Sequence, residues 1–92
     1  MPVKTTNVIL THVNPEQWIN TVKVVRQLRA KHKMEAGLKE SVELVNEVRD
    51  KGREVNLLTG VSQYHARTAR QRLREVKAVC RLSQKLVPLE EG

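Results

Sequence analysis

Aromatic residues are nearly missing from this 92-residue sequence, which has one Trp, one Tyr and no Phe. A hydrophobic core must therefore be built from Val, Leu, Ile and Ala, and a hydrophobic content of 39% predicts that the chain folds. The single cysteine, Cys80, excludes an internal disulfide. No run of about 18 apolar residues is present, which excludes a membrane-spanning helix, and no charged segment leads into an apolar one near the N-terminus. We therefore expect a cytoplasmic protein with no membrane partner.

Glycine is scarce as well, and the four glycines stand apart, which excludes a glycine-rich phosphate loop. The histidines His12, His32 and His65 share no spacing typical of metal ligands, and Cys80 fits a core position. No nucleophile with a neighbouring base stands out in the sequence. The sequence therefore predicts a non-enzymatic protein that needs no metal and no other cofactor.

Acidic residues are outnumbered, because 10 Asp and Glu stand against 17 Lys and Arg, for a net charge of +7. Residues 23–33 carry five bases and no acid, and residues 34–58 carry six acids and four bases. Residues 59–85 carry seven bases and one acid. Two basic segments thus flank an acidic one, which favours either an anionic partner or a solvated basic surface.

Hydrophobic patterns predict three strands and three helices. The predicted elements, in order, are a strand at 7–13, a helix at 15–33, a helix at 38–50, a strand at 53–58, a helix at 62–76 and a strand at 78–82. This order indicates an α+β domain in two layers, with a small antiparallel sheet and three helices on one face. We expect a single domain over residues 1–92, folded from about 7 to 83, with a frayed tail at 87–92. The pattern leaves open whether residues 29–36 extend the first helix or form a loop.

Each predicted helix has an apolar stripe at helical spacing. The stripes consist of Trp18, Val22, Val25 and Leu28; of Leu38, Val42, Val45 and Val48; and of Ala66, Ala69, Leu73 and Val76. Asn14 and Ser62 are predicted N-caps, and Gly52 is predicted to end the second helix in a left-handed conformation. Two interpretations remain open before the second helix. Gly37 either only begins the helix or allows a close approach of another backbone, and Leu38 is either core or an exposed anchor.

Basic residues line one flank of the third predicted helix. At spacings of three, four and three residues, they are Arg67, Arg70, Arg74 and Lys77. Like charges at such spacings repel by roughly a few tenths of a kcal/mol per pair, which an anionic partner would offset. The flank therefore predicts binding of nucleic acid or of an acidic protein, and the alternative is a solvated face. Because no exposed aromatic residue is expected, base stacking is not predicted, and nucleic-acid contacts would go mainly to phosphates.

A second basic cluster belongs to the first predicted helix and comprises Lys23, Arg26, Arg29 and Lys33. The same two interpretations apply to it, an anionic partner or a solvated face. The cluster directly precedes the stretch Gly37–Glu40, so the two segments are candidates for one common surface.

The stretches TVKVVRQL (21–28) and GLKESVELV (37–45) fall on the first and second predicted helices. They resemble the two central helices in the C-terminal domain of the bacterial ribosomal stalk protein, the seven/twelve protein of the large subunit. NVILTHVNP (7–15) is similar to that family's first strand and turn, and GVSQYHARTARQRLREVKAVCRL (60–82) is similar to its last helix and last strand. The resemblance implies a βααβαβ fold. It also implies a domain that recruits translational GTPases to the ribosome through its first two helices.

Carried over position by position, the resemblance implies a partner-binding surface. Its members in this sequence are Val22, Lys23, Arg26, Gly37, Leu38, Lys39 and Glu40. The chain departs from the family by several extra residues within RAKHKMEA (29–36) and by Lys77, where the family has a glycine. The family's N-terminal tether has no counterpart in the sequence, so we expect a free-standing, divergent copy of the stalk domain.

We therefore expect a non-enzymatic binding module that engages a translational GTPase, a ribosomal component or another acidic protein. One alternative is a basic nucleic-acid-binding protein that contacts phosphates through the arginines of the third helix. Another is the degradation adaptor that shares this fold. EVRDKGREV (47–55) is similar to that adaptor's central segment, although THVNP (11–15) stands where the adaptor has an acidic turn. A last alternative places the chain in a larger complex, and the sequence makes no prediction of oligomeric state.

Overall fold

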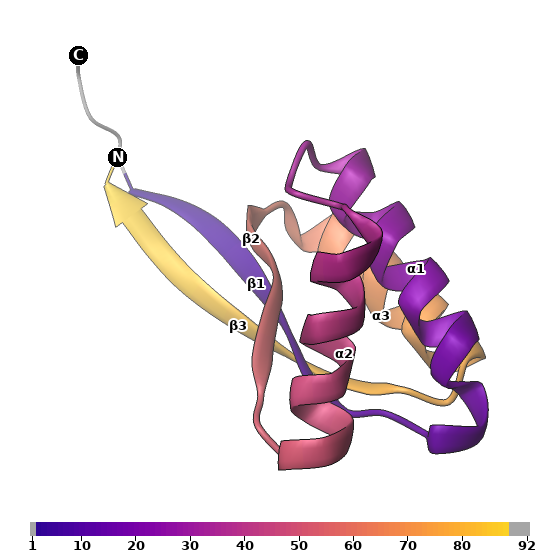
Figure 1. The fold of residues 1–92 in the computed structure, drawn as a ribbon. Coiled ribbons are helices and arrows are strands. Elements are labelled where there is room, and N and C mark those ends of the chain that lie inside the picture. The colour runs from indigo at the N-terminus through magenta and orange to yellow at the C-terminus, as the bar shows by residue number, and fades with distance from the viewer. Residues whose placement is uncertain (1, 89–92) are drawn as a thin grey trace.

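The structure, a computed structural model, describes residues 2–88 and the side chains of residues 4–84. Its elements, in chain order, are β1 (Pro2–His12), the short 3₁₀ helix η1 (Pro15–Gln17), α1 (Trp18–Lys31), α2 (Leu38–Lys51), β2 (Val55–Val61), α3 (Gln63–Glu75) and β3 (Val79–Pro88). The strands form an antiparallel sheet in the order β2-β1-β3, and the helices cover one face of it (Figure 1). The predicted α+β fold and the predicted order of strands and helices are confirmed.

The two longest strands extend beyond their predicted bounds. β1 begins at Pro2 instead of residue 7, and β3 continues to Pro88 instead of ending at residue 82, so that these two residues pair. β2 pairs with β1 only from Thr6 onward, and the outer part of the β1–β3 pair therefore extends from the body as a two-stranded ribbon (Figure 1). The predicted folded range of 7–83 was too short. Val87 and Pro88, predicted as tail, lie in β3, and the rest of the predicted tail lies outside the described residues.

These strand ends mix polar and apolar residues without a regular alternation, which explains why the sequence did not reveal them. Lys4 and Thr5 in β1 and Ser83 and Gln84 in β3 give no alternation of apolar and polar residues. Their strand conformation depends on pairing with a segment distant in the chain, and such pairing overrides local propensity.

β2 also differs from its prediction, since it spans Val55–Val61 and includes the predicted turn at Thr59 and Gly60. Gly60 has a φ of 69°, and its N–H donates to Asn7 Oδ1 at 2.9 Å. The register of the β1–β2 pair shifts beside it. A glycine with positive φ at a register shift is typical of a β-bulge, so the chain turns toward α3 without leaving the sheet early.

The helix ends agree with the predicted caps. Asn14 Oδ1 accepts a backbone N–H of η1 at 2.9 Å, and Ser62 Oγ accepts a backbone N–H of α3 at 3.2 Å. Gly52 ends α2 with a left-handed φ of 64°. α1 ends at Lys31, two residues before its predicted end, and residues 32–37 form a loop before α2.

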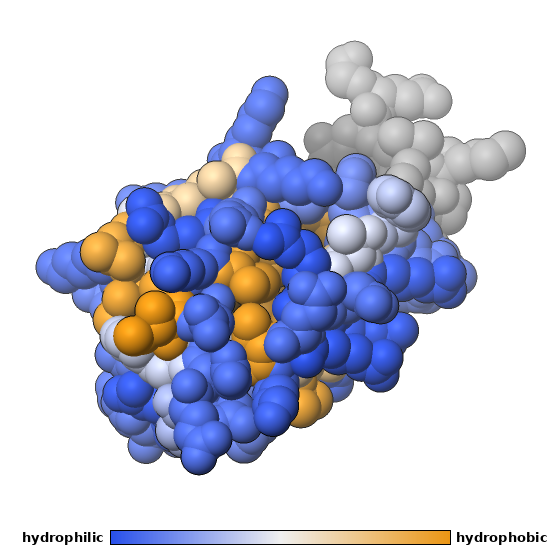
Figure 2. Space-filling view, turned by 90° about the vertical axis from the view of Figure 1, so that its right-hand side faces the viewer, coloured by the Kyte–Doolittle hydropathy of each residue, from blue (hydrophilic) through white to orange (hydrophobic). Residues whose placement is uncertain are grey.

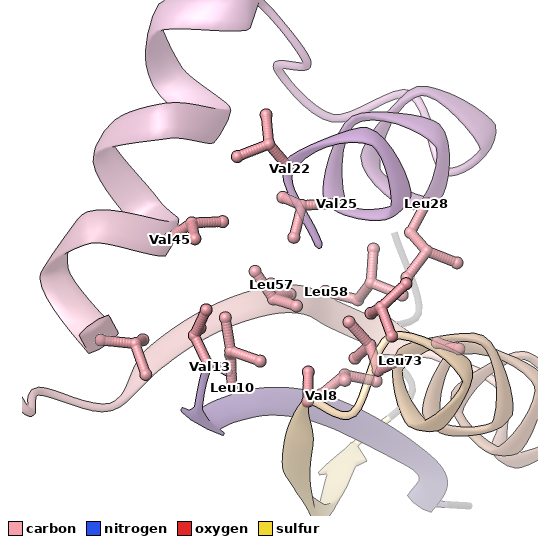
Figure 3. Packing of buried hydrophobic residues seen from close by; sticks show 14 of the residues in the cluster. Val8, Leu10, Val13, Val22, Val25, Leu28, Val45, Leu57, Leu58 and Leu73 are labelled. Atoms are coloured by element: carbon pink, nitrogen blue, oxygen red, sulfur yellow. The ribbon is translucent and has the colours of Figure 1, made fainter. Parts of the chain in front are cut away.

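The core lies between the sheet and the helices (Figure 3). Its buried hydrophobic residues are Val8, Leu10, Val13, Val22, Val25, Leu28, Val45, Val48, Leu57, Leu58, Val61, Ala66, Ala69, Leu73, Val76 and Ala78. The predicted stripe of α3 is buried throughout, whereas Trp18 and Val42 are only partly buried in α1 and α2. Leu38 is 57% exposed, so the structure supports the interpretation of Leu38 as an exposed side chain.

Candidate docking cleft between α1 and α2

A cleft of about 310 Å³ lies between α1 and α2. The side chains that line it are Trp18, Ile19, Val22, Lys23, Arg26, Leu38 and Val42. Ile19 of α1 is 61% exposed and Leu38 of α2 is 57% exposed. On the face that α1 presents, Figure 2 shows hydrophobic surface enclosed by hydrophilic side chains. An exposed apolar patch with a polar rim is typical of an interaction surface.

The floor of the cleft rests on the core, because Val22 is only 4% exposed and Val42 is half-buried. Trp18 forms a wall whose position is fixed by two contacts. Its Nε1 donates to Asn46 Oδ1 at 2.8 Å, and the Arg49 guanidinium lies 5.1 Å from the centroid of the indole ring, in a cation–π contact. The hydrogen bond joins the start of α1 to the middle of α2, so this wall is formed before any partner binds.

Two cations stand on the rim of the cleft. Lys23 and Arg26 are exposed and lie about one turn apart on α1. Arg26 Nε donates to the Ala36 carbonyl at 3.4 Å, which places the guanidinium beside the turn into α2. A neighbouring depression of about 280 Å³ is lined by Lys23, Arg26, Gln27, Ala30 and Ala36. The structure therefore brings Lys23, Arg26 and the turn before α2 together on one exposed surface.

The turn into α2 is built on Gly37, which is the N-cap of the helix, with a φ of −62° and a ψ of 153°. Its carbonyl accepts the N–H of Ser41 at 3.0 Å. This backbone conformation is open to any residue, and an added Cβ would meet only the Glu40 side chain, at 4.0 Å. The structure thus supports the interpretation in which Gly37 only begins the helix, because no neighbouring group comes close enough to require a residue without a side chain.

The first turn of α2 also carries Lys39 and Glu40. Lys39 is exposed, and Glu40 is half-buried. Partial desolvation is the main cause that raises the pKa of Glu40, and repulsion from the Glu35 carboxylate raises it further. The first turn of α2 therefore presents both signs of charge, whereas the charged residues of α1 are all cations.

Arg29 and Lys33 were predicted as further members of the basic cluster, but neither lines the cleft. Arg29 Nε donates to the Glu35 carbonyl at 2.7 Å, and its Nη1 donates to the Leu57 carbonyl at 2.8 Å. The guanidinium thus ties the loop 32–37 to β2, a structural task that the sequence did not indicate. Lys33 is exposed in that loop, with a left-handed φ of 57°.

The basic residues of α3 lie on a different surface, because α1 stands between α2 and α3 (Figure 3). Arg67 and Arg74 are exposed, and Arg70 is half-buried. Lys77 follows the end of α3 and has a left-handed φ of 57°, a conformation that favours glycine. Four of the predicted site residues thus line the cleft, namely Val22, Lys23, Arg26 and Leu38. Gly37, Lys39 and Glu40 lie at the start of α2 outside its lining, Arg29 and Lys33 lie away from it, and the remaining basic residues belong to α3 and its C-terminal end.

Three exposed apolar residues could not be singled out from the sequence, namely Ile19, Tyr64 and Val79. Ile19 follows Trp18 directly, beside the predicted stripe of α1, and Tyr64 stands in the first turn of α3 with 74% of its surface exposed. For Ile19 the available signal was an apolar residue one position away from a buried stripe, whereas Tyr64 stands two positions before Ala66, the first member of the α3 stripe.

Outside the cleft, the histidines of the loop 32–37 and of α3 contact each other and the cap of α3. The rings of His32 and His65 meet edge to face with centroids 5.0 Å apart. Partial burial is the main cause that lowers the pKa of His32, and the nearby charges of His65 and Lys31 lower it further. His65 Nδ1 lies 2.9 Å from Ser62 Oγ, within the cap of α3. Within residues 4–84 no group of three or more His, Cys, Asp or Glu side chains is placed to hold a metal ion.

No helix in the part of the chain that the structure describes is long and apolar enough to cross a membrane. Comparison of the sequence with protein-family models and with curated proteins finds no match.

Proposed function

We propose that this chain is a non-enzymatic, cytoplasmic docking module whose α1–α2 cleft binds a segment of a translational GTPase or of a ribosomal component. One observation carries the proposal: Ile19 and Leu38, from two different helices, are both more than half exposed and line one cleft. Lys23 and Arg26 add positive charge at its rim. The resemblance to the stalk domain supports this choice of partner, and the observed order of strands and helices is the one that the resemblance implies.

The cleft suits an amphipathic helix that presents an apolar stripe and acidic residues beside it. Grooves between two helices commonly accept a third helix in this way. Complete burial of the exposed parts of Ile19 and Leu38 would contribute about 2 to 3 kcal/mol. The cations at the rim would chiefly increase the association rate and select against basic partners.

A binding titration with a purified bacterial elongation-factor GTPase tests the proposal. Leu38→Asp should abolish measurable binding, because it places a carboxylate on the apolar lining. Arg26→Glu should weaken binding by about tenfold or more, as expected for reversal of a charge at an interface. Lys4→Glu is the matched control, because it changes the net charge equally at an exposed position on the β1–β3 ribbon, and it should bind like the wild type.

Thermal unfolding of the variants separates loss of binding from loss of fold. Both substituted residues of the cleft have exposed side chains, so we expect the variants to remain folded. Failure of the wild-type chain to bind the GTPase, or equal weakening by Lys4→Glu and Arg26→Glu, would contradict docking at the cleft.

A further inference from the structure

The outer face of α3 is a second surface that docking at the cleft does not use. Arg67, Arg70 and Arg74 project from one side of the helix, and about 10.5 Å separates the first from the last along the helix axis. The ion pairs within residues 4–84 join Arg49 to Asp50, Lys51 and Arg53 to Glu47, and Arg81 to Glu54. In this described part of the chain the three arginines of α3 therefore have no carboxylate partner.

The three arginines border two shallow depressions. One of about 240 Å³ lies between α3 and the start of β3 and is lined by Arg70, Arg74, Ala78, Val79 and Cys80. Burial raises the pKa of the Cys80 thiol, and the charges of Arg70 and Arg74 oppose this shift. Both guanidinium groups therefore act on the same small volume, where an anionic group can be held by two cations at once.

An aromatic ring lies beside these cations. Tyr64 is 74% exposed, and it lines the second depression, of about 360 Å³, together with Arg67, Thr68, Gln71 and Arg72. The Tyr64 ring meets the His65 ring edge to face at 5.5 Å, which supports it from one side. A solvent-exposed ring next to arginines is the combination by which proteins stack on bases while they hold phosphates.

We infer that the outer face of α3 binds single-stranded nucleic acid, with Arg67, Arg70 and Arg74 on phosphates and the Tyr64 ring stacked on a base. An acidic protein would make no use of the exposed ring. A duplex would have to admit the helix into its major groove, but α3 is flanked by α1, to which Arg72 is joined through Gln27. A flexible single strand can follow such a surface without a protruding helix.

Fluorescence anisotropy with a labelled twelve-nucleotide oligouridine tests this inference on the full chain. Neutralisation of Arg67, Arg70 and Arg74 to Gln should weaken binding strongly and reduce the salt slope by about 2, since each phosphate contact on a single strand contributes about 0.7. The matched control neutralises Lys23, Arg26 and Lys39 to Gln. It removes the same charge from α1 and the first turn of α2 and should change the affinity less than about threefold, so the test stands apart from that of the docking proposal.

Tyr64 provides the test of stacking. Tyr64→Ala should weaken oligouridine binding by about tenfold, and Tyr64→Phe should restore it, because the ring face is retained. Should the triple arginine variant fail to fold, Arg67→Gln and Arg74→Gln are tested singly, since both positions are exposed.

Three outcomes would overturn the inference. They are absence of oligouridine binding at low salt, equal losses from the α3 and cleft triple variants, and binding of polyglutamate or duplex DNA as tight as that of oligouridine. The last outcome would show a general polyanion surface, an acidic-protein site or a duplex site.

Discussion

The cleft between α1 and α2 and the outer face of α3 are both basic, but they are built differently. The cleft has apolar side chains from two helices, and its cations, Lys23 and Arg26, stand at the rim. The face of α3 has its cations along one helix, with a single exposed ring, Tyr64, beside them. An apolar floor recognises shape and is little affected by salt, whereas a row of cations recognises charge and weakens steeply with salt. Net charge alone would not distinguish the two surfaces.

The largest effect that tests this comparison comes from two apolar residues of α2. Val45 is fully buried and Leu38 is 57% exposed. Val45→Ala should lower the free energy of unfolding by about 2 to 3 kcal/mol, through lost burial and the cavity left behind. Leu38→Ala should lower it by less than about 0.5 kcal/mol. Urea denaturation measures both, and an equal loss from the two variants would place Leu38 in the core and remove it from the cleft.

Two arginines of α1 provide the next largest effect. Arg29 donates to the carbonyls of Glu35 and Leu57, so Arg29→Gln should destabilise the fold by about 2 kcal/mol, the range for hydrogen bonds from charged donors. Arg26→Gln should cost less than about 0.5 kcal/mol, because Arg26 is exposed and makes one long contact. Chemical denaturation of the two variants measures both free energies of unfolding. Equal losses from Arg29→Gln and Arg26→Gln would contradict a structural role for Arg29.

Lys77 should show a smaller effect with the opposite sign. Its φ of 57° costs a non-glycine residue about 1 to 2 kcal/mol, partly offset by the lower backbone entropy of a lysine in the unfolded chain. Lys77→Gly should therefore stabilise the protein by about 0.5 to 1 kcal/mol in a thermal melt. Lys77→Gln removes the same charge and retains the backbone cost, so a gain from Gln as large as that from Gly would attribute the effect to charge.

The smallest effect concerns pH, at the contact between the loop 32–37 and α3. Burial, with His65 and Lys31 nearby, lowers the pKa of His32 below its ordinary 6.5. The unfolded chain therefore takes up a proton more readily, so the stability present above the ordinary pKa of 6.5 decreases as the pH falls below it. His32→Asn should flatten this decrease, and the exposed His12 serves as the control through His12→Asn. A pH profile of unfolding that is the same in all three proteins would refute the assignment.

Much of the helical structure could be predicted from the sequence, because it depends on short-range features. The stripe of α3, the caps at Asn14 and Ser62, and the left-handed Gly52 all depend on residues within one or two turns. The ends of β1 and β3 could not be predicted, because they lack a regular alternation and become strand only through pairing across more than 70 positions of the chain.

The candidate site could be predicted only in part, for a related reason. Periodicity puts Arg26 and Arg29 one turn apart on the same helix and treats them alike. They differ only because Arg29 reaches the Leu57 carbonyl of β2, a contact that depends on the packing of distant elements. Ile19 was missed since the sequence alone does not say where α2 leaves the surface of α1 uncovered.

An NMR titration tests the central claim most directly. The uniformly ¹⁵N-labelled chain is titrated with an unlabelled bacterial elongation-factor GTPase, and changes of the amide resonances are mapped onto the structure. Docking at the cleft predicts the largest changes at Ile19, Lys23 and Leu38, with the amides of Arg67–Arg74 unaffected. Changes confined to α3, or none at a saturating concentration of the GTPase, would contradict it.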